Sequence, residues 1–195
     1  MRRVRNNHET GRLRIQGRAS GRKTCLVVWW LSVKMTLTHE EQMVCMLSAI
    51  KWETDTGKTM SNPQRYQKDL STYEYLVETA EAIGSEWAVA KYFDLPFDPY
   101  QQKFKGVADV GNAIEVRWTK YVTGQLIIHE YDRPNDIAVL VTGQAPHYFI
   151  AGWIPIAMAQ RPKYRHSKQP NWWVTQINLQ PIENLRRSNY GQSSI

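Results

Sequence analysis

The chain has 195 residues, 42% of them hydrophobic and 22% charged, and a formal net charge of +7. These values are typical of one globular domain, and the apolar run at residues 25–33 is much shorter than the roughly 20 residues of a membrane-spanning helix. The two cysteines, Cys25 and Cys45, argue against a secreted disulfide scaffold, so a cytoplasmic protein without a membrane partner is predicted.

The positive charge is concentrated in the first 34 residues, which hold nine basic side chains and one acidic side chain. Residues 35–195 hold 16 basic and 17 acidic side chains, so their net charge is −1. We interpret residues 1–34 as a basic extension, disordered or non-native, that precedes a single nuclease-like domain at 35–188. The alternative is an arm that binds nucleic acid through its phosphates. Residues 189–195 are predicted to be a frayed tail.

Two helices are predicted in the first half of the domain. A capping-box pattern predicts a helix at residues 38–52, and a polar stretch at 53–70 predicts a loop. One face of the first helix is predicted to be apolar and to carry Met43, Leu47 and Ile50. A second helix is predicted at about 71–93, where Gly84 indicates a kink or close packing.

Short β-rich runs separated by turn residues follow the second helix. They predict strands at residues 106–110, 113–119, 125–130, 137–142, 148–154 and 171–175. Residues 179–185 are predicted to close the domain. Helices first and a mostly antiparallel sheet afterwards indicate an α+β fold.

Asp109, Glu115 and Arg117 are the leading candidates for chemistry. Glu115 and Arg117 are two residues apart in a predicted strand, so their side chains point to the same face. Carboxylates on adjacent strands can hold a hard divalent cation through oxygen ligands. Such a cation activates water and offsets the charge of a phosphate, and a nearby guanidinium stabilises the same charge.

The turn between the two strands decides whether the carboxylates meet. A two-residue loop at 111–112 would turn Asp109 away from Glu115. A three-residue loop at 111–113 places Asp109 opposite Glu115 on one face, and we predict this loop or a bulge. The alternative for these residues is a solvated sheet face with a surface ion pair.

The pattern Asp109–x5–Glu115–x–Arg117 resembles the PD-(D/E)XK nuclease superfamily. Upstream, residues 84–92 resemble the helix that precedes this core in the branch containing archaeal Holliday-junction resolvases. The likeness covers roughly residues 71–155. It implies a restriction-endonuclease-like core, α/β/α-like, in which helices flank a central mixed, mostly antiparallel sheet.

The resemblance also implies a Mg²⁺ site, with Mn²⁺ as an alternative, formed by Asp109, Glu115 and the backbone carbonyl of Val116. Glu86 on the upstream helix would join the site directly or through water. Arg117 takes the position usually held by lysine. An arginine stays charged and cannot shuttle a proton, but it can orient a phosphate or water. Lys120 could replace the missing ammonium or contact nucleic acid.

A second group of basic residues lies near the C-terminal end of the domain. Nucleic-acid contacts are predicted for Arg161, Lys163, Arg165 and Lys168. Tyr164, Trp172 and Trp173 lie among or after them, which suits a phosphate backbone and an unstacked base. The alternative is a solvated loop followed by a core tryptophan.

The connection at residues 131–136 and the histidine before it are weaker candidates. Asp132 and Arg133 are predicted to organise the turn between two strands, or alternatively to border the site. His129 is predicted to be an exposed edge residue, with a place in the site as the alternative.

These patterns predict a Mg²⁺-dependent endodeoxyribonuclease that hydrolyses phosphodiester bonds of DNA. RNA is an alternative substrate and a homodimer an alternative assembly. A catalytically weak or inactive nucleic-acid-binding module on the same fold is the second hypothesis, suggested by Arg117. A structural or interaction protein is the third. Small nucleases of this kind suit phages and mobile elements, which is an argument by analogy.

Overall fold

The computed structural model describes residues 32–56, 70–101 and 107–195, apart from the side chains of 192–194. Its helices and strands are β1 (Val33–Thr36), α1 (His39–Thr56), α2 (Thr72–Phe93), β2 (Ile114–Thr119), β3 (Leu126–His129), β4 (Ile137–Gln144), β5 (His147–Pro155), α3 (Ile156–Ala159), η3 (Pro162–Tyr164), β6 (Asn171–Val174), η4 (Gln176–Asn178), η5 (Ile182–Arg187) and α4 (Asn189–Ser194). Most of the predicted extension at 1–34 and most of the predicted loop at 53–70 lie outside the described residues.

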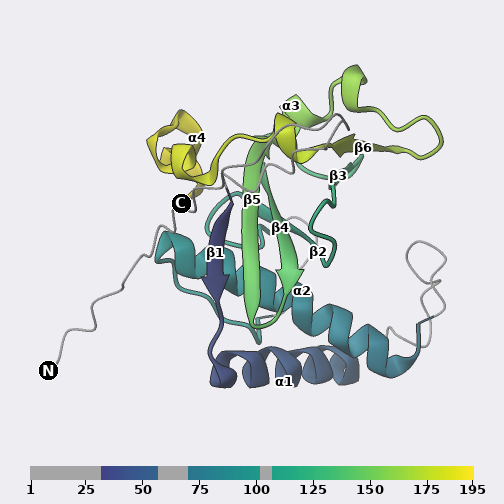
Figure 1. Cartoon of the computed structure of the whole chain (residues 1–195), viewed down its shortest axis with the longest axis vertical. Coiled ribbons are helices and arrows are strands. Elements are labelled where there is room, and N and C mark those ends of the chain that lie inside the picture. The colour runs from purple at the N-terminus through teal and green to yellow at the C-terminus, as the bar shows by residue number, and fades with distance from the viewer. Residues whose placement is uncertain (1–31, 57–69, 102–106) are drawn as a thin grey trace, which may run out of the picture.

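The main sheet is mixed and has the strand order β1-β5-β4-β2 (Figure 1). β1 and β4 are antiparallel to β5, whereas β2 runs parallel to β4. β3 and β6 form a separate antiparallel ribbon. An α+β fold with a mixed sheet and flanking helices is thus confirmed, but β1 precedes α1, so the helices do not strictly come first.

The central strand β4 is buried on both faces and therefore contributes to two cores. Ile137, Val139 and Val141 pack in the core that α1 and α2 cover. Ala138 and Leu140 pack in a second core with the β3–β6 ribbon and α3. Because side chains alternate along a strand, one short sequence serves both cores. Figure 1 shows α1 and the ribbon near opposite ends of the sheet.

The first helix presents a different face to the core than predicted. Met43, Leu47 and Ile50 are 51%, 51% and 42% exposed, whereas Cys45 and Ala49 are buried. The reason is that α1 packs mainly against α2 and not against the sheet. Small side chains at this contact allow the two helix axes to approach closely, and larger apolar residues stay outside.

Both predicted ends of the domain need correction. β1 begins at Val33, so the last two residues of the predicted extension at 1–34 belong to the sheet. The predicted frayed tail at 189–195 forms α4, in which the ring of Tyr190 lies 5.8 Å from that of Trp153. A four-residue strand and a six-residue helix gain their order from these tertiary contacts, which local patterns do not reveal.

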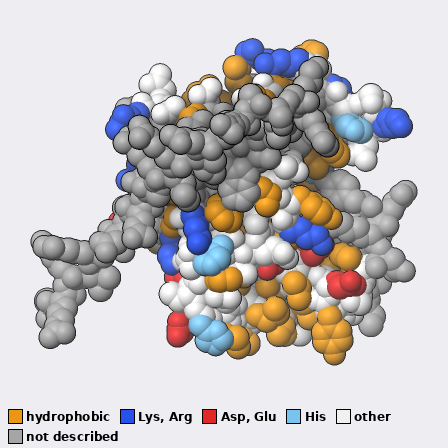
Figure 2. All heavy atoms as spheres, viewed as in Figure 1, with side chains coloured by type: hydrophobic (Ala, Val, Ile, Leu, Met, Phe, Trp, Pro, Cys, Tyr) orange, Lys and Arg blue, Asp and Glu red, His pale blue; other side chains and the backbone are white. Residues whose placement is uncertain are grey.

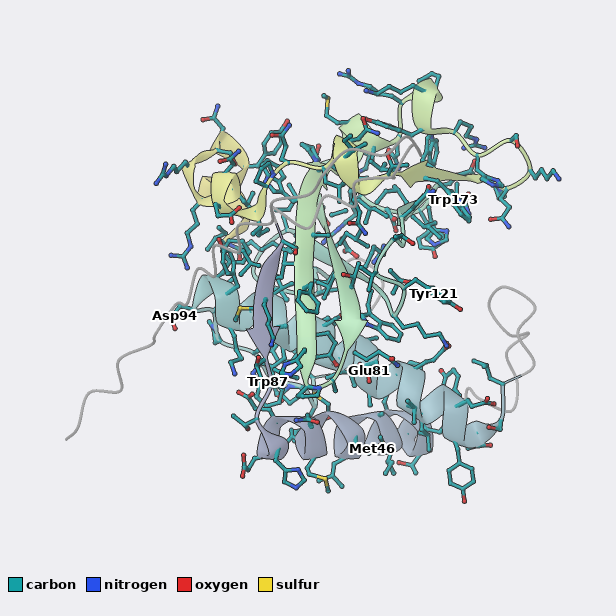
Figure 3. All side chains as sticks on the ribbon, viewed as in Figure 1. Met46, Glu81, Trp87, Asp94, Tyr121 and Trp173 are labelled. Carbon is teal, nitrogen blue, oxygen red and sulfur yellow. The ribbon has the colours of Figure 1, made fainter. Side chains whose placement is uncertain are left out.

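Gly84 marks close packing, one of the two alternatives predicted for it. α2 continues through this position, and a Cβ added at Gly84 would lie 2.3 Å from Oη of Tyr148. Tyr148 is 1% exposed, and its hydroxyl donates a hydrogen bond to Glu81 of α2 at 2.8 Å. Figure 3 shows Glu81 where α2 passes the lower ends of β4 and β5. The missing side chain therefore lets α2 lie directly on β5.

Replacing Gly84 with alanine should lower the free energy of unfolding by about 1–3 kcal/mol, because the buried Tyr148 ring has to move. This loss exceeds the gain of at most about 1 kcal/mol from placing alanine in a helix. Urea denaturation measures it. In a Tyr148→Phe background, which lacks the nearer atom, the same substitution should cost less. An equal cost in both backgrounds would contradict the role of the hydroxyl.

Candidate functional site

A three-residue loop connects the segment of Asp109 to β2, as predicted. Val110 and Ile114 exchange two backbone hydrogen bonds, at 3.0 and 3.2 Å, so residues 111–113 form the loop. Gly111 has a φ of 58°, a left-handed conformation that glycine adopts without strain. This register places Asp109 opposite Glu115.

Asp109, Glu115 and Arg117 meet on one face of the sheet. Ile114 and Val116 are buried in the core under the helices, so Glu115 and Arg117 point to the opposite face. Oδ2 of Asp109 accepts a hydrogen bond from the backbone N–H of Val116 at 2.8 Å. The aspartate is thereby fixed to β2, and the predicted convergence of the two carboxylates is confirmed.

The guanidinium of Arg117 lies at the centre of this arrangement. Its Nη1 atom is 3.2 Å from Oε2 of Glu115, 3.3 Å from the carbonyl oxygen of Val116 and 3.8 Å from Oδ2 of Asp109. Its Nη2 atom donates to Oδ1 of Asp132 at 2.8 Å. The three oxygens predicted to bind a metal therefore surround one nitrogen of the arginine.

The connection between β3 and β4 adds further charged residues to this arrangement. From the sequence, we predict only that Asp132 and Arg133 organise a turn or border the site. Asp132 organises its turn, because Oδ2 accepts the N–H of His129 at 2.8 Å, and it also binds Arg117. Arg133 forms an ion pair with Asp136 and has its Nη2 atom 3.6 Å from Oε1 of Glu115. The sequence feature that could have identified these residues as part of the site is the high density of charged side chains at 131–136.

We call this group the acidic cluster. Its members are Asp109, Glu115, Asp132 and Asp136 with the cations Arg117 and Arg133. Four carboxylates and two guanidiniums give a formal charge of −2. Burial and the nearby charge of Asp109 raise the pKa of Glu115 to about 7, against the opposing effect of Arg117. Burial acts to lower the pKa of Arg117, but its carboxylate neighbours raise it overall, so it stays charged.

The oxygens around Nη1 of Arg117 fit a hard divalent cation. The carboxylates of Asp109 and Glu115 and the carbonyl of Val116 are the oxygen ligands that Mg²⁺ or Mn²⁺ prefers. Within the described residues, no group of three or more His, Cys, Asp or Glu side chains is placed to hold a metal ion. The backbone carbonyl would therefore complete the donor set, and a cation would compete with Nη1 for the same oxygens.

Glu86 is not brought to the acidic cluster, which corrects its predicted role as a ligand. Its charge instead acts on Cys45 of α1, where burial and the acidic neighbours raise the pKa of the thiol. Among the described residues, Glu86 is not one of the charges that shift Glu115. The physical reason is that α2 packs on the face of β2 opposite to Glu115.

Lys120 does not supply the missing ammonium to the cluster either. It is exposed just after the end of β2, with Nζ 5.7 Å from the ring centroid of Tyr121, and its charge acts on Glu74 of α2. Figure 3 shows Tyr121 at the edge of the molecule, between the ribbon and α2. A nucleic-acid contact for Lys120 stays a prediction.

The other predicted nucleic-acid contacts lie together on residues 161–173, which we call the basic hairpin. The backbone N–H of His166 donates to the carbonyl of Asn171 at 2.9 Å, and an isolated bridge joins Arg165 to Trp172. The basic side chains, all exposed, are Arg161, Lys163, Arg165 and Lys168. The sequence has no acidic residue from 137 to 182. Figure 2 shows Lys, Arg and His side chains gathered at the upper right, over this part of the chain.

Glu115→Gln should make the stability of the protein less sensitive to pH. The pKa of Glu115 rises from 4.5 to about 7 on folding, so the folded state binds the proton more tightly and wild-type stability falls as pH rises between these values. The variant has no such loss, and its stability relative to wild type should rise by up to about 3 kcal/mol from pH 4.5 to pH 8. Denaturation at both pH values tests this, and a pH-independent difference would contradict the raised pKa.

Comparison with protein-family models, with curated proteins and with solved structures finds no match for this chain. No helix in the described ranges has the length and apolar character needed to cross a membrane. The function has therefore to be argued from the acidic cluster and its surroundings.

Proposed function

We propose that this protein is a divalent-metal-dependent endonuclease that hydrolyses phosphodiester bonds of DNA. The observation that carries the proposal is the convergence of Asp109, Glu115 and the Val116 carbonyl on one point. The three-residue loop that this convergence requires is present. The succession of a helix, a segment with Asp109 and a strand with Glu115 supports a restriction-endonuclease-like core.

The charge of the acidic cluster supports a divalent cation. With a formal charge of −2, the cluster would repel a phosphodiester, and one divalent cation brings the sum to zero. When bound, Mg²⁺ or Mn²⁺ supplies an activated water and offsets the negative charge of the phosphate. The oxygens of Asp109, Glu115 and Val116 would hold it.

The side chains of the cluster supply the remaining chemistry. Glu115, whose pKa is about 7 without a metal, is partly ionised near neutral pH and can lose its proton to bind the cation. Arg117 stays charged, and if a cation displaced Nη1 from the oxygens of Glu115 and Val116, that nitrogen could donate to a phosphate. Asp132 is a positioning residue, since its hydrogen bond at 2.8 Å fixes Nη2 of Arg117. The basic hairpin supplies phosphate contacts away from the reacting bond.

One observation favours a second candidate, a nucleic-acid-binding module without catalysis. Nη1 of Arg117 already lies among the oxygens that would bind the metal, so the guanidinium itself compensates part of their charge. In such a module Arg117 would permanently replace the cation. The two candidates differ in whether a divalent ion displaces Nη1, and this difference is measurable.

Cleavage of supercoiled plasmid DNA tests the proposal. With Mg²⁺ or Mn²⁺ the wild type should nick or linearise the plasmid, and Asp109→Asn or Glu115→Gln should reduce the rate by at least about 100-fold while DNA binding persists. Glu40→Gln, at an exposed position in the first turn of α1, is the matched control and should cleave like wild type. A wild type that binds DNA but cleaves no linear, branched or single-stranded DNA with either ion would refute the enzyme and favour the module.

The competition between Arg117 and the metal has its own test in thermal unfolding. Arg117→Met should destabilise the metal-free protein by roughly 3–5 kcal/mol, because it leaves buried carboxylates without their partner. Mg²⁺ should then raise the melting temperature of this variant more than that of wild type, since no guanidinium competes for the oxygens. Glu40→Gln again serves as the control. An equal or smaller Mg²⁺ shift in Arg117→Met would contradict the competition.

A further inference from the structure

We infer that the outer face of the β3–β6 ribbon binds unpaired bases, so that the substrate is DNA with a single-stranded segment beside the acidic cluster. This inference rests on the proposed function for the position of the cleaved bond. The binding of unpaired bases stands on separate observations: two ring stacks, their shared face and the exposed basic side chains of the basic hairpin.

Two pairs of aromatic rings are stacked on this part of the molecule. The ring of Tyr131 lies on that of His129 with a centroid distance of 5.0 Å and an interplanar angle of 4°. The ring of His166 lies on that of Trp173 at 4.7 Å and 27°. Nε1 of Trp173 also donates to Oδ1 of Asn171 at 2.8 Å, which fixes the indole. Rings already held in place lose little conformational entropy when a base stacks on them.

The ribbon register puts the two stacks on one face. His129 pairs with Asn171, the residue two positions before Trp173, so His129 and Trp173 are diagonal neighbours. Such neighbours are about 7–8 Å apart in an antiparallel sheet. Ile128 and Val174, which alternate with them, are buried in the second core. Figure 3 shows Trp173 beside the ribbon, toward the right of the molecule.

The stacked rings are at least partly accessible, and within the described ranges none of them belongs to either hydrophobic core. Tyr131 is 66% exposed, and His129, His166 and Trp173 are half-buried. The adjacent Trp172 behaves differently, because it packs against the second core. The sequence left open whether these tryptophans belong to the core or to a binding surface. In the structure, Trp172 packs against the core and Trp173 lies on the outer face.

The basic hairpin that carries His166 also carries exposed basic side chains that can contact phosphates. Lys163 and Lys168 of the basic hairpin are exposed, and Nζ of Lys163 lies 4.5 Å from the ring centroid of Tyr164. Arg165 lies 4.5 Å from the ring centroid of Trp172 and pairs with Glu130 at 3.0 Å. Basic side chains that follow a phosphate backbone, combined with rings that stack on bases, are the chemistry by which proteins bind single strands. Paired bases inside a duplex do not expose their faces to such rings.

Two hydrogen bonds connect the stacking face to the acidic cluster. The backbone N–H of His129 donates to Oδ2 of Asp132 at 2.8 Å, and Oδ1 of the same carboxylate accepts from Arg117. Tyr131 directly precedes Asp132 in the chain. A nucleotide whose base stacks on Tyr131 would therefore lie beside the turn that holds Arg117.

Fluorescence anisotropy with a labelled oligo(dT) of about 20 nucleotides, in EDTA, tests the inference without any cleavage. The wild type should bind oligo(dT) more tightly than a duplex of equal length. Tyr131→Ala and His166→Ala should each weaken oligo(dT) binding roughly 5- to 100-fold and duplex binding less than twofold. Tyr131→Phe, which keeps the ring, should bind like wild type. Tyr73→Ala on α2, where the tyrosine is 83% exposed, is the matched control and should have no effect.

The outcomes separate this inference from the proposed function. Unchanged oligo(dT) binding in both Tyr131→Ala and His166→Ala would overturn the stacking face, whether or not the wild type cleaves plasmid. Weakened binding in these variants, together with a wild type that never cleaves DNA, would support the stacking face and refute the enzyme. Oligo(rU) of the same length separates the two strand chemistries, and tighter binding of oligo(rU) than of oligo(dT) would overturn DNA as the ligand.

Discussion

The ion pairs of Arg117 are the constraint on which this face of the protein depends. Carboxylates about 4 Å apart repel each other by roughly 4 kcal/mol at the effective dielectric of a protein surface, and burial increases the cost. Arg117 offsets this repulsion by contacting Asp109, Glu115 and Asp132, which come from three segments of the chain. One side chain thereby fixes the start of β2 against the turn that follows β3. These contacts and the second core together hold the ribbon against the sheet.

The sequence predicted what depends on local periodicity and missed what depends on packing between elements. The same-face placement of Asp109 and Glu115 follows from the two-residue period of a strand and the length of one loop. Glu86 lies on α2, which packs on the face of β2 opposite to Glu115. This placement depends on tertiary contacts that local periodicity does not reveal. The exposure of Met43 has the same origin, because a helix that packs on another helix buries its small residues.

The acidic cluster extends beyond its predicted members for a related reason. Asp132 and Arg133 carried a local signal, a charged turn, and Asp132 does organise that turn through His129. Its second contact, with Arg117, joins residues that are 15 apart in the chain, one in β2 of the main sheet and one in the turn that follows β3. A carboxylate has two oxygens with separate lone pairs, so one side chain can satisfy a turn and a distant guanidinium together. Only the assembled fold reveals the second role.

The charge of the cluster suggests why an arginine can stand where lysine is expected. Four carboxylates and two guanidiniums leave −2, and a site this buried lowers its charge by taking up protons or a cation. Glu115, whose pKa is about 7, can lower the charge of the cluster by taking up a proton near neutral pH. In the proposed function, binding of a divalent ion would be the second way to lower the charge, and it would require Glu115 to lose its proton. Because Asp132 holds Nη2 separately, Arg117 can release Nη1 from the oxygens without leaving the cluster. In the proposed enzyme, the arginine would compensate charge before the metal binds and would remain close enough to contact the phosphate afterwards.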